Sequence, residues 1–485
     1  MTGSASRSTL AKATLWTLAD FIADRGANFV IIIVLARLLS PAEFGTVALL
    51  AVFIALATLL TESGLGQALI QAEDISDTDT STVFWLNLGI AGAAALALVL
   101  AAPIVAGFFD QPLLVPLMQI LVLGVIFGAF GTVQRALLLR ALEYRKLLIA
   151  RVGATIIAGS LAIALAMQGF GVFALAWQAC AMALVTSVLL WLLGRWRPRA
   201  VFDGAAAKRL FSFGGFMLGS SILETIYSRA YTLFIGTISS ASVLGLYSRA
   251  EATITLAQGF VTYPINQIAF PALSRIADER EKIRSAMSSA LKTAALLNFP
   301  ALFGLAALAE PFLVTLYGDQ WAGAAPFIQI LCLGGVLMPL HILNLQALMA
   351  VGRADLFFAL EVAKKATGIA ILVYSSQWGA IGIAWGVVAA GFVAVFINTS
   401  LSGKNFGYGV LAQMRDLIPG LTLGLCAATA AYAITTLSPV AEMAMVAKLI
   451  FGSLAGAGVW AVLTFGLNLG GARHMVRAIL RKAAG

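Results

Sequence analysis

Six basic residues lie inside stretches of the chain that are otherwise long and apolar. A charge at the centre of a bilayer costs roughly 2.5–3.5 kcal/mol on insertion scales, so such residues usually face a protein interior or a water-filled path. Six of them facing lipid would together cost on the order of 18 kcal/mol, more than a typical folding stability. Most should therefore line an interior that can bind anions. The six are Arg25, Arg229, Arg249, Lys292, Lys364 and Lys365.

Spacing along the helices ranks these cations. Glu361 stands four residues before Lys365, the favourable order for a salt bridge, which leaves Lys364 to face elsewhere. Arg229, Arg249 and Lys292 have no acid three or four residues away and are predicted to be the freer cations. For each cation the alternative to a cavity is an ion pair between helices. Arginine suits bidentate phosphate contacts, whereas lysine offers a simpler point charge.

Six acidic residues occur in the same apolar stretches. They are either partners of the cations or sites that couple transport to a proton or sodium gradient, with the membrane potential as another driving force. Two carboxylates four residues apart near the start of the chain repel, so one is protonated or both share a cation. No resident cofactor or metal is expected. The six acids are Asp20, Asp24, Glu62, Glu224, Glu251 and Glu361.

Amide side chains in the apolar stretches are candidates for binding sugar hydroxyls. A packing hydrogen bond between helices is an equal alternative for each of them. His341 stands alone and is interpreted as a buried hydrogen-bonding residue rather than a proton relay. The candidate sugar contacts are Asn28, Asn266, Gln267, Asn344 and Gln346.

Composition indicates an all-α polytopic membrane protein. Of 485 residues, 61% are hydrophobic and only 11% are charged, and the mean hydropathy is +0.96. Soluble domains have about 45–50% apolar and 25% charged residues. At about 20 apolar residues per helix, the chain predicts about fourteen transmembrane helices. They lie near 14–38, 42–69, 82–108, 113–137, 147–168, 171–194, 210–237, 242–270, 285–309, 323–350, 355–376, 379–401, 416–437 and 444–469.

The distribution of basic residues predicts the orientation. Alternate loops carry 23 of the 31 lysines and arginines, whereas opposite loops such as 168–171 and 238–241 carry none. The positive-inside rule therefore places both termini in the cytoplasm. Because this asymmetry explains most of the net charge of +9, nucleic acid is not an expected partner.

The loops are too short for a soluble catalytic domain. Asp77-Thr78-Asp79 resembles a metal-binding DxD motif, but it lies in a short connector without a nucleotide-binding domain, so a solvated loop is the default. A polysaccharide polymerase or ligase would need a large outer loop rich in His and Arg, which the chain lacks. We therefore expect a protein that is not an enzyme and has no catalytic residues.

A weak internal repeat of 200 residues suggests two halves. The segments 39–45 and 239–245 each join the first two helices of a half, and Gln67 matches Gln267. Parallel repeats in transporters place a cavity at their interface. We expect two six-helix lobes, 1–200 and 201–405, followed by 406–485 as an appended pair of helices with a basic cytoplasmic tail. Prolines at 264, 271, 300 and 339 and the pair Gly214-Gly215 are candidate kinks for rocking lobes.

Several motifs across the chain resemble one family. These are LLSPAEFG at 38–45, ESGLGQALIQ at 62–71, STVFWLNLG at 81–89, FPALSRI at 270–276, YGDQWAGAAPFIQIL at 317–331 and LQALMAVGRADL at 345–356. In this order and spacing the chain resembles the Wzx-like polysaccharide-export flippases of the multidrug/oligosaccharidyl-lipid/polysaccharide (MOP) exporter superfamily. The similarity is to the lipopolysaccharide-biosynthesis branch with the colanic acid and teichuronic acid exporters.

The resemblance implies a function and a setting. Members move an undecaprenyl-pyrophosphate-linked oligosaccharide from the inner to the outer leaflet of the bacterial cytoplasmic membrane, by alternating access through a cationic central cavity. Expected partners are this lipid-linked substrate, membrane lipids, a polysaccharide polymerase and glycosyltransferases, and a monomer is expected. The alternative within the superfamily is an ion-coupled drug exporter of the MATE type, whose interior would be dominated by acids.

Overall fold

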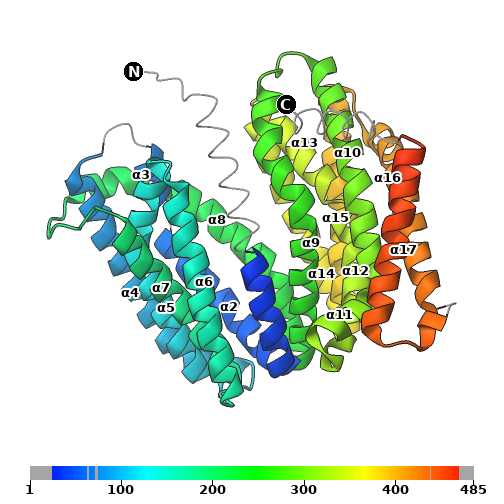
Figure 1. Ribbon diagram of the computed structural model, residues 1–485. Helices are drawn as coiled ribbons and strands as arrows, with labels where there is room; N and C mark the ends of the chain where they lie inside the picture. Colours follow the sequence, from blue (N-terminus) through cyan, green and yellow to red (C-terminus); the bar gives the residue numbers. More distant parts are fainter. Residues whose placement is uncertain (1–24, 63–64, 72–74, 437–438, 469–485) are drawn as a thin grey trace, which may run out of the picture. The chain divides into compact units, whose positions relative to one another are not determined.

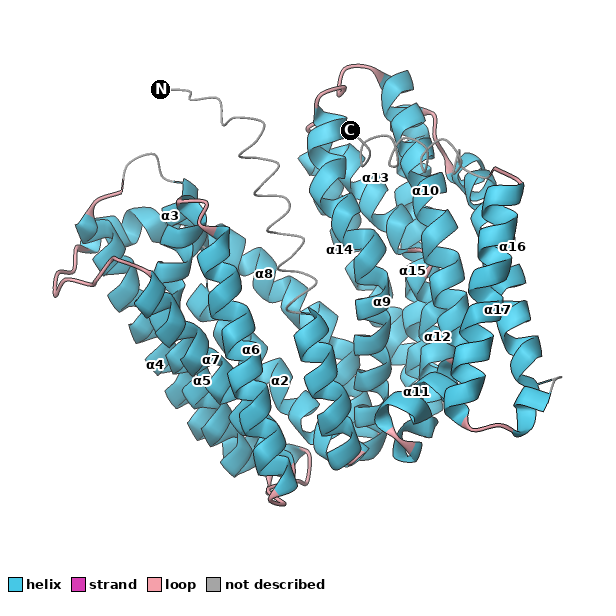
Figure 2. Cartoon of the chain, viewed as in Figure 1, coloured by secondary structure: helices cyan, strands magenta, loops and turns pink. Residues whose placement is uncertain are grey.

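The computed structural model describes residues 25–62, 65–71, 75–436 and 439–468. Within these residues every regular element is a helix, as Figure 2 shows, so the predicted all-α class is confirmed. Of the candidate site residues, Asp20 and Asp24 lie outside the described residues. The chain divides into two compact units, unit 1 from Met1 to Gly245 and unit 2 from Leu246 to Gly485.

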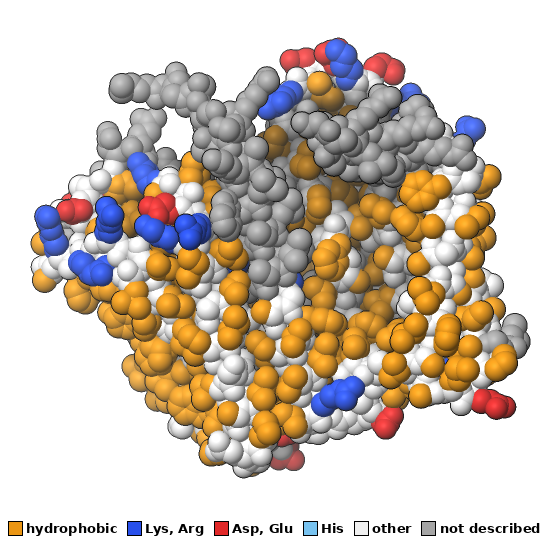
Figure 3. Space-filling model, in the orientation of Figure 1, with side chains coloured by type: hydrophobic (Ala, Val, Ile, Leu, Met, Phe, Trp, Pro, Cys, Tyr) orange, Lys and Arg blue, Asp and Glu red, His pale blue; other side chains and the backbone are white. Residues whose placement is uncertain are grey.

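Unit 1 consists of long helices with short connections (Figure 1). Its centre is α5, which packs against α2, α4 and α7, and its residues Leu114, Leu117 and Met118 are completely buried. In Figure 3 hydrophobic side chains cover the sides of the helices of unit 1, and Lys and Arg gather at one end. Its elements are a helix over 25–38, α2 (Pro41–Glu62), α3 (Leu65–Gln71), α4 (Asp77–Phe108), α5 (Leu114–Arg140), α6 (Tyr144–Met167), α7 (Val172–Leu193), α8 (Gly204–Ile238) and the first turn of α9 (Ala241–Ser274).

Unit 2 holds the rest of α9 and the remaining helices. Its most extensive helix pair is α10 with α16, and α17 packs on α16. A Cβ atom added to Gly420 would lie 2.7 Å from the Cβ of Ala295, so the two backbones approach closely. The further elements are α10 (Arg280–Ala307), α11 (Ala309–Tyr317), η1 (Asp319–Ala324), α12 (Ala325–Gly335), α13 (Met338–Ala350), α14 (Ala354–Ser375), η2 (Ser376–Trp378), α15 (Gly379–Phe406), α16 (Val410–Thr436), η3 (Pro439–Glu442) and α17 (Met445–Gly466).

Ten stretches in the described part of the chain are long and apolar enough to cross a membrane. Two of them, Asp319–Ala350 and Ala359–Phe406, contain more than one helix each. The exact number of fourteen transmembrane helices stays a prediction. The protein is nevertheless a multi-pass membrane protein.

Several predicted boundaries change. The span 42–69 is two helices, because α2 ends at Glu62 and α3 begins at Leu65. The span 323–350 is likewise divided into α12 and α13, and Pro339 lies in the first turn of α13, where its missing N–H removes no helical hydrogen bond. Pro264, Pro271 and Pro300 lie inside α9 and α10 as expected.

The Asp77-Thr78-Asp79 motif is the first turn of α4 and not a loop. Ser76 caps this helix: its Oγ accepts from the Asp79 backbone N–H at 3.0 Å, and the Asp79 carboxylate accepts from the Ser76 backbone N–H at 3.0 Å. Asp77 forms an ion pair of 2.9 Å with Arg199. Both carboxylates therefore stabilise a helix end, where negative charge is favourable.

The repeated segments 39–45 and 239–245 are equivalent helix starts. Ser40 and Glu43 form a capping box at the start of α2, in which the Glu43 Oε2 accepts from the Ser40 N–H at 2.6 Å. At the start of α9 the Ser240 Oγ accepts from the Val243 N–H at 3.4 Å. The repeat is thus a signal for two helix N-termini.

The two helix starts cross at a glycine in each. A Cβ atom added to Gly45 would lie 1.7 Å from the carbonyl oxygen of Ala241, and one added to Gly245 would lie 1.8 Å from the carbonyl oxygen of Pro41. The contact is reciprocal and has no room for a side chain. Residues 241–245 therefore belong to unit 1, although α9 continues into unit 2. The predicted lobes 1–200, 201–405 and 406–485 stay a prediction.

Candidate functional site

One turn of α14 carries three ionised groups that are largely shielded from solvent. The side chains of Lys364, Lys365 and Glu361 are 11%, 16% and 23% exposed. Glu361 is paired with Lys364 through Oε1, and its Oε2 lies 3.8 Å from the Nζ of Lys365. Their formal charges sum to +1, because one carboxylate faces two ammonium groups. We call these three residues the α14 charge cluster.

The predicted division of roles between the two lysines is wrong. Lys364 was expected to face away from Glu361, yet it forms the closer pair. The physical reason is that residues three apart on a helix are neighbours just as residues four apart are. Glu361 therefore lies within reach of both lysines.

Helices α13 and α15 add polar groups to this region of unit 2. The Nδ1 of His341 on α13 lies 3.3 Å from the Nδ2 of Asn398 on α15. His341 thus has a hydrogen-bonding neighbour, as predicted, although it is half-buried and not fully buried. This contact joins α13 to α15, and both helices pack against α14, which carries the charge cluster.

A second polar network fastens α10 to α16. Asp416 on α16 accepts hydrogen bonds from Ser288 Oγ at 2.5 Å and from Tyr408 OH at 2.8 Å, and its Oδ1 lies 3.2 Å from the Nζ of Lys292. Burial, reinforced by the bond to Asp416, raises the pKa of the Tyr408 hydroxyl well above its usual range. Lys292, predicted to be one of the freer cations, is instead ion-paired.

Arg249 on α9 is buried, with 9% of its surface exposed. Its guanidinium carbon lies 5.8 Å from the ring centroid of Tyr317, which ends α11 and is also buried. This is the geometry of a cation–π contact, in which the negative ring face attracts the cation. The described structure therefore gives Arg249 an aromatic neighbour that spacing along its own helix did not reveal.

Four further candidate charges are exposed on their helices. Arg25 begins the helix over 25–38, and Arg229 and Glu224 lie on α8 in unit 1, whereas Glu251 lies on α9 in unit 2. In a membrane protein such exposure means contact with lipid or with a water-filled space. Glu62 is the last residue of α2. Whether these residues line a transport cavity stays a prediction.

The candidate amides form two pairs in unit 2. Asn344 and Gln413 exchange hydrogen bonds of 2.9 Å between α13 and α16, and both side chains are buried. Gln346 donates to Asn266 at 3.4 Å between α13 and α9. Three of the candidates thus form hydrogen bonds between helices, and their binding of sugar stays a prediction. Gln267 is exposed on α9 and Asn28 is half-buried in unit 1.

Sequence reasoning missed three members of these networks, Asp416, Gln413 and Tyr317. Asp416 is the first residue of the predicted thirteenth span and Gln413 lies three residues before it, where polar residues are ordinary. Their signal was their position: an acid and an amide three residues apart share one face of a helix. Tyr317 gave no comparable signal, because its role depends on the approach of α9.

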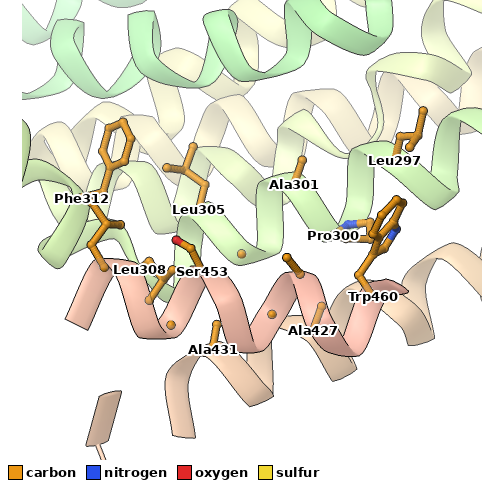
Figure 4. Close-up of a pocket in the computed structure, with 15 residues that line it drawn as sticks. Leu297, Pro300, Ala301, Leu305, Leu308, Phe312, Ala427, Ala431, Ser453 and Trp460 are labelled. Atoms are coloured by element: carbon orange, nitrogen blue, oxygen red, sulfur yellow. The ribbon is translucent and has the colours of Figure 1, made fainter. Parts of the chain in front are cut away.

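Unit 2 also contains an apolar groove of about 380 Å³ (Figure 4). Its walls come from α10, α11 and α17, and α16 contributes small residues. Trp460 on α17 donates its indole N–H to the Leu296 carbonyl at 3.0 Å, which fixes α17 to α10 at one end of the groove. The lining is suited to hydrocarbon.

Comparison with known proteins gives concordant results. Residues 34–326 match a family described as "Polysaccharide biosynthesis protein". The chain is 30% identical over 395 residues to the lipopolysaccharide biosynthesis protein WzxC of Escherichia coli (strain K12). The aligned region covers 80% of this chain and 78% of that protein.

Two solved structures share the fold. The lipid II flippase MurJ, in an inward closed conformation, gives a TM-score of 0.73 at 12% identity, over 94% of this chain and 99% of that chain. An inward-facing multidrug resistance MATE family transporter of the MOP superfamily gives a TM-score of 0.63 at 16% identity, over 83% of this chain and 99% of that chain. The family match and the identity to WzxC confirm the predicted family, and the likeness to the two solved structures confirms the predicted fold.

Proposed function

The chain belongs to the polysaccharide biosynthesis protein family, and from this membership we propose that it is a lipid-linked oligosaccharide flippase of the MOP exporter superfamily. Its substrate is an undecaprenyl-pyrophosphate-linked oligosaccharide, which it moves from the cytoplasmic to the outer leaflet of the bacterial cytoplasmic membrane. The product serves the synthesis of a surface polysaccharide. The observation that carries the proposal is the 30% identity to WzxC over four fifths of the chain.

The chemistry of the substrate sets requirements for the protein. A pyrophosphate and a hydrophilic glycan must be kept out of hydrocarbon, whereas the long polyprenyl tail is stable in it. The α14 charge cluster supports the first requirement, because its formal charge of +1 is held among shielded side chains. An anion at this site shares the two ammonium groups with the Glu361 carboxylate, and charge-assisted contacts are about twice as strong as neutral ones.

Transport proceeds by alternating access in this proposal. Both termini lie in the cytoplasm, as the basic loops favour, and the cationic residues receive the pyrophosphate from that side. Prolines inside α9 and α10 are points at which these helices can bend. A proton or sodium gradient, or the membrane potential acting on the anionic substrate, supplies the driving force.

The test is reconstitution of the full chain in proteoliposomes that contain undecaprenyl-pyrophosphate-linked oligosaccharide. Translocation is measured as the fraction of glycan that a glycosidase cleaves from outside. We expect Lys364→Ala and Arg229→Ala each to lower the rate by about tenfold or more, because a charge-assisted contact contributes about 1.5–3 kcal/mol. Reconstituted amounts should stay equal.

Lys448→Ala is the matched control, since Lys448 lies in the first turn of α17, near a helix end where a lysine reaches the interface. It should translocate at the rate of the unchanged protein. Normal rates in both Lys364→Ala and Arg229→Ala would remove these residues from the substrate path. Absence of glycan translocation combined with export of small cationic drugs would replace the proposal by the MATE-type alternative.

A further inference from the structure

Unit 1 contains a groove of its own, with a volume of about 440 Å³. It lies among α2, α3, α5 and α7, and its lining follows α5 from Leu121 to Leu139. At 1.5 Å per residue this is a path of about 27 Å, close to the roughly 30 Å thickness of a bilayer's hydrocarbon core. The groove is therefore long enough for an extended lipid chain.

Three glycines on α5 line the groove, and one of them, Gly128, faces open space. Gly124, Gly128 and Gly131 follow one another at intervals of four and three residues, which places them on one face of the helix. A Cβ atom added to Gly128 would meet no atom within 4 Å. The space beside Gly128 is thus empty volume of the groove, which a larger side chain would fill without disturbing the helices.

Hydroxyl groups line the same groove toward the C-terminal ends of the helices. Thr61 donates its proton to the Thr58 carbonyl at 2.7 Å, and Thr132 donates to the Gly128 carbonyl at 3.4 Å, each within its own helix. Because these protons are used, the hydroxyl oxygens offer lone pairs. They suit a ligand that donates hydrogen bonds, such as one that carries hydroxyl groups of its own.

Arg135 supplies the charge. It stands one turn beyond Thr132 on α5, lines the groove and is exposed. Arginine stays protonated and its planar guanidinium matches a phosphate in geometry. The opposite part of the groove is apolar, with Leu121 and Val125 from α5 and Met182 from α7. A ligand that satisfies all three zones has an apolar chain, a phosphate and a hydroxylated head.

We propose that this groove binds an anionic glycerophospholipid with a hydroxylated headgroup, phosphatidylglycerol. One acyl chain lies against Gly124 and Gly128, the phosphate contacts Arg135, and the headgroup hydroxyls donate to the threonine oxygens. The site is distinct from the α14 charge cluster, which belongs to unit 2. It is a binding site for a lipid of the surrounding membrane and is independent of the proposed transport substrate.

The experiment is native mass spectrometry of the purified full chain in detergent, titrated separately with phosphatidylglycerol, phosphatidylethanolamine and undecaprenyl phosphate. We expect phosphatidylglycerol to bind more tightly than the other two. Gly128→Leu fills the groove and Arg135→Gln removes the charge, and each should weaken phosphatidylglycerol binding by about tenfold, the equivalent of roughly 1.4 kcal/mol.

Two variants serve as matched controls. Gly89→Leu adds the same side chain on α4, where a Cβ atom also meets nothing within 4 Å, and Arg145→Gln removes an exposed arginine from α6. Neither residue lines the groove, so both should bind phosphatidylglycerol normally. Size-exclusion profiles verify that all four variants fold.

Three results would overturn the proposal. The first is unchanged phosphatidylglycerol binding in both Gly128→Leu and Arg135→Gln. The second is equal binding of phosphatidylethanolamine, which would remove the role of the charge and the hydroxyls. The third is tighter binding of undecaprenyl phosphate, which would assign the groove to a polyprenyl carrier.

Discussion

The groove of unit 1 and the α10–α16 contact of unit 2 use polar residues for opposite purposes. In the groove, Thr61 and Thr132 bond to carbonyls of their own helices, so the space between helices stays open. In unit 2, Ser288 and Asp416 lie 128 residues apart and bond across two helices. A polar residue that bonds within its own helix thus leaves space between helices, whereas one that bonds to another helix holds the two helices together.

Ser187 shows that the effect of a hydroxyl residue depends on where its hydrogen-bond acceptor lies and not on the residue type. It lines the groove, yet it donates at 2.6 Å to the Phe127 carbonyl on α5 and so ties α7 to its neighbour. Gly131 allows this approach, since a Cβ atom there would lie 2.7 Å from the Ser187 oxygen. The groove is therefore lined by Ser187, which joins two helices, and by Thr61 and Thr132, which bond only within their own helices.

The largest expected effect comes from removing the acceptor in unit 2. Asp416→Ala takes away the partner of Ser288, Tyr408 and Lys292, so it should lower the free energy of unfolding by about 3 kcal/mol. The thermal unfolding midpoint of the purified protein in detergent measures this. Asp319→Ala, at an exposed residue of η1, is the control and should unfold as the unchanged protein does. Equal midpoints for the two variants would contradict the fastening role.

An intermediate effect is expected from the amide pair between α13 and α16. Asn344→Leu and Gln413→Leu should each destabilise by about 2 kcal/mol, because each leaves a buried amide without its partner. The double variant should cost about 1 kcal/mol less than the sum of the two. Strictly additive unfolding free energies would show that the two amides do not act as a pair.

The smallest effect is expected in the groove. Thr132→Val keeps the shape of the side chain and loses only a bond within α5, so the free energy of unfolding should change by less than about 1 kcal/mol. Ser187→Ala should cost about 1 kcal/mol, because its bond joins two helices. A larger loss for Thr132→Val than for Ser187→Ala would reverse the distinction drawn here.

Much of the fold follows from the sequence. Hydropathy located most of the long helices, and the pattern of Ser40, Pro41 and Glu43 is a helix start that can be recognised from residue types alone. The close packing of α16 on α10 was not predicted, because the last two helices were expected to be an appendage. The spacing of Gly420 and Gly424 carried that information, since small residues four apart allow close contact between membrane helices.

The candidate site could be predicted only where partners share a helix. Glu361 and its two lysines are close in sequence, and spacing predicted that an ion pair forms there. Lys292 and Arg249 have partners on other helices, Asp416 and Tyr317. Helix periodicity cannot predict such a contact, because the contact depends on how two segments far apart in the sequence pack.

The reciprocal crossing of Gly45 and Gly245 bears on how the protein is made. Unit 1 includes residues 241–245, which close against the start of α2. A chain emerging from the ribosome supplies one side of this contact near its beginning and the other side only at its midpoint. Domains generally fold as units during synthesis, N-terminal first.

Unit 1 is therefore completed only when the first turn of α9, residues 241–245, has been made. Until residue 245 has been translated, α2 presents a bare backbone surface at Gly45 where Ala241 and Gly245 will pack. The first half of the nascent protein is complete only once the second half has begun.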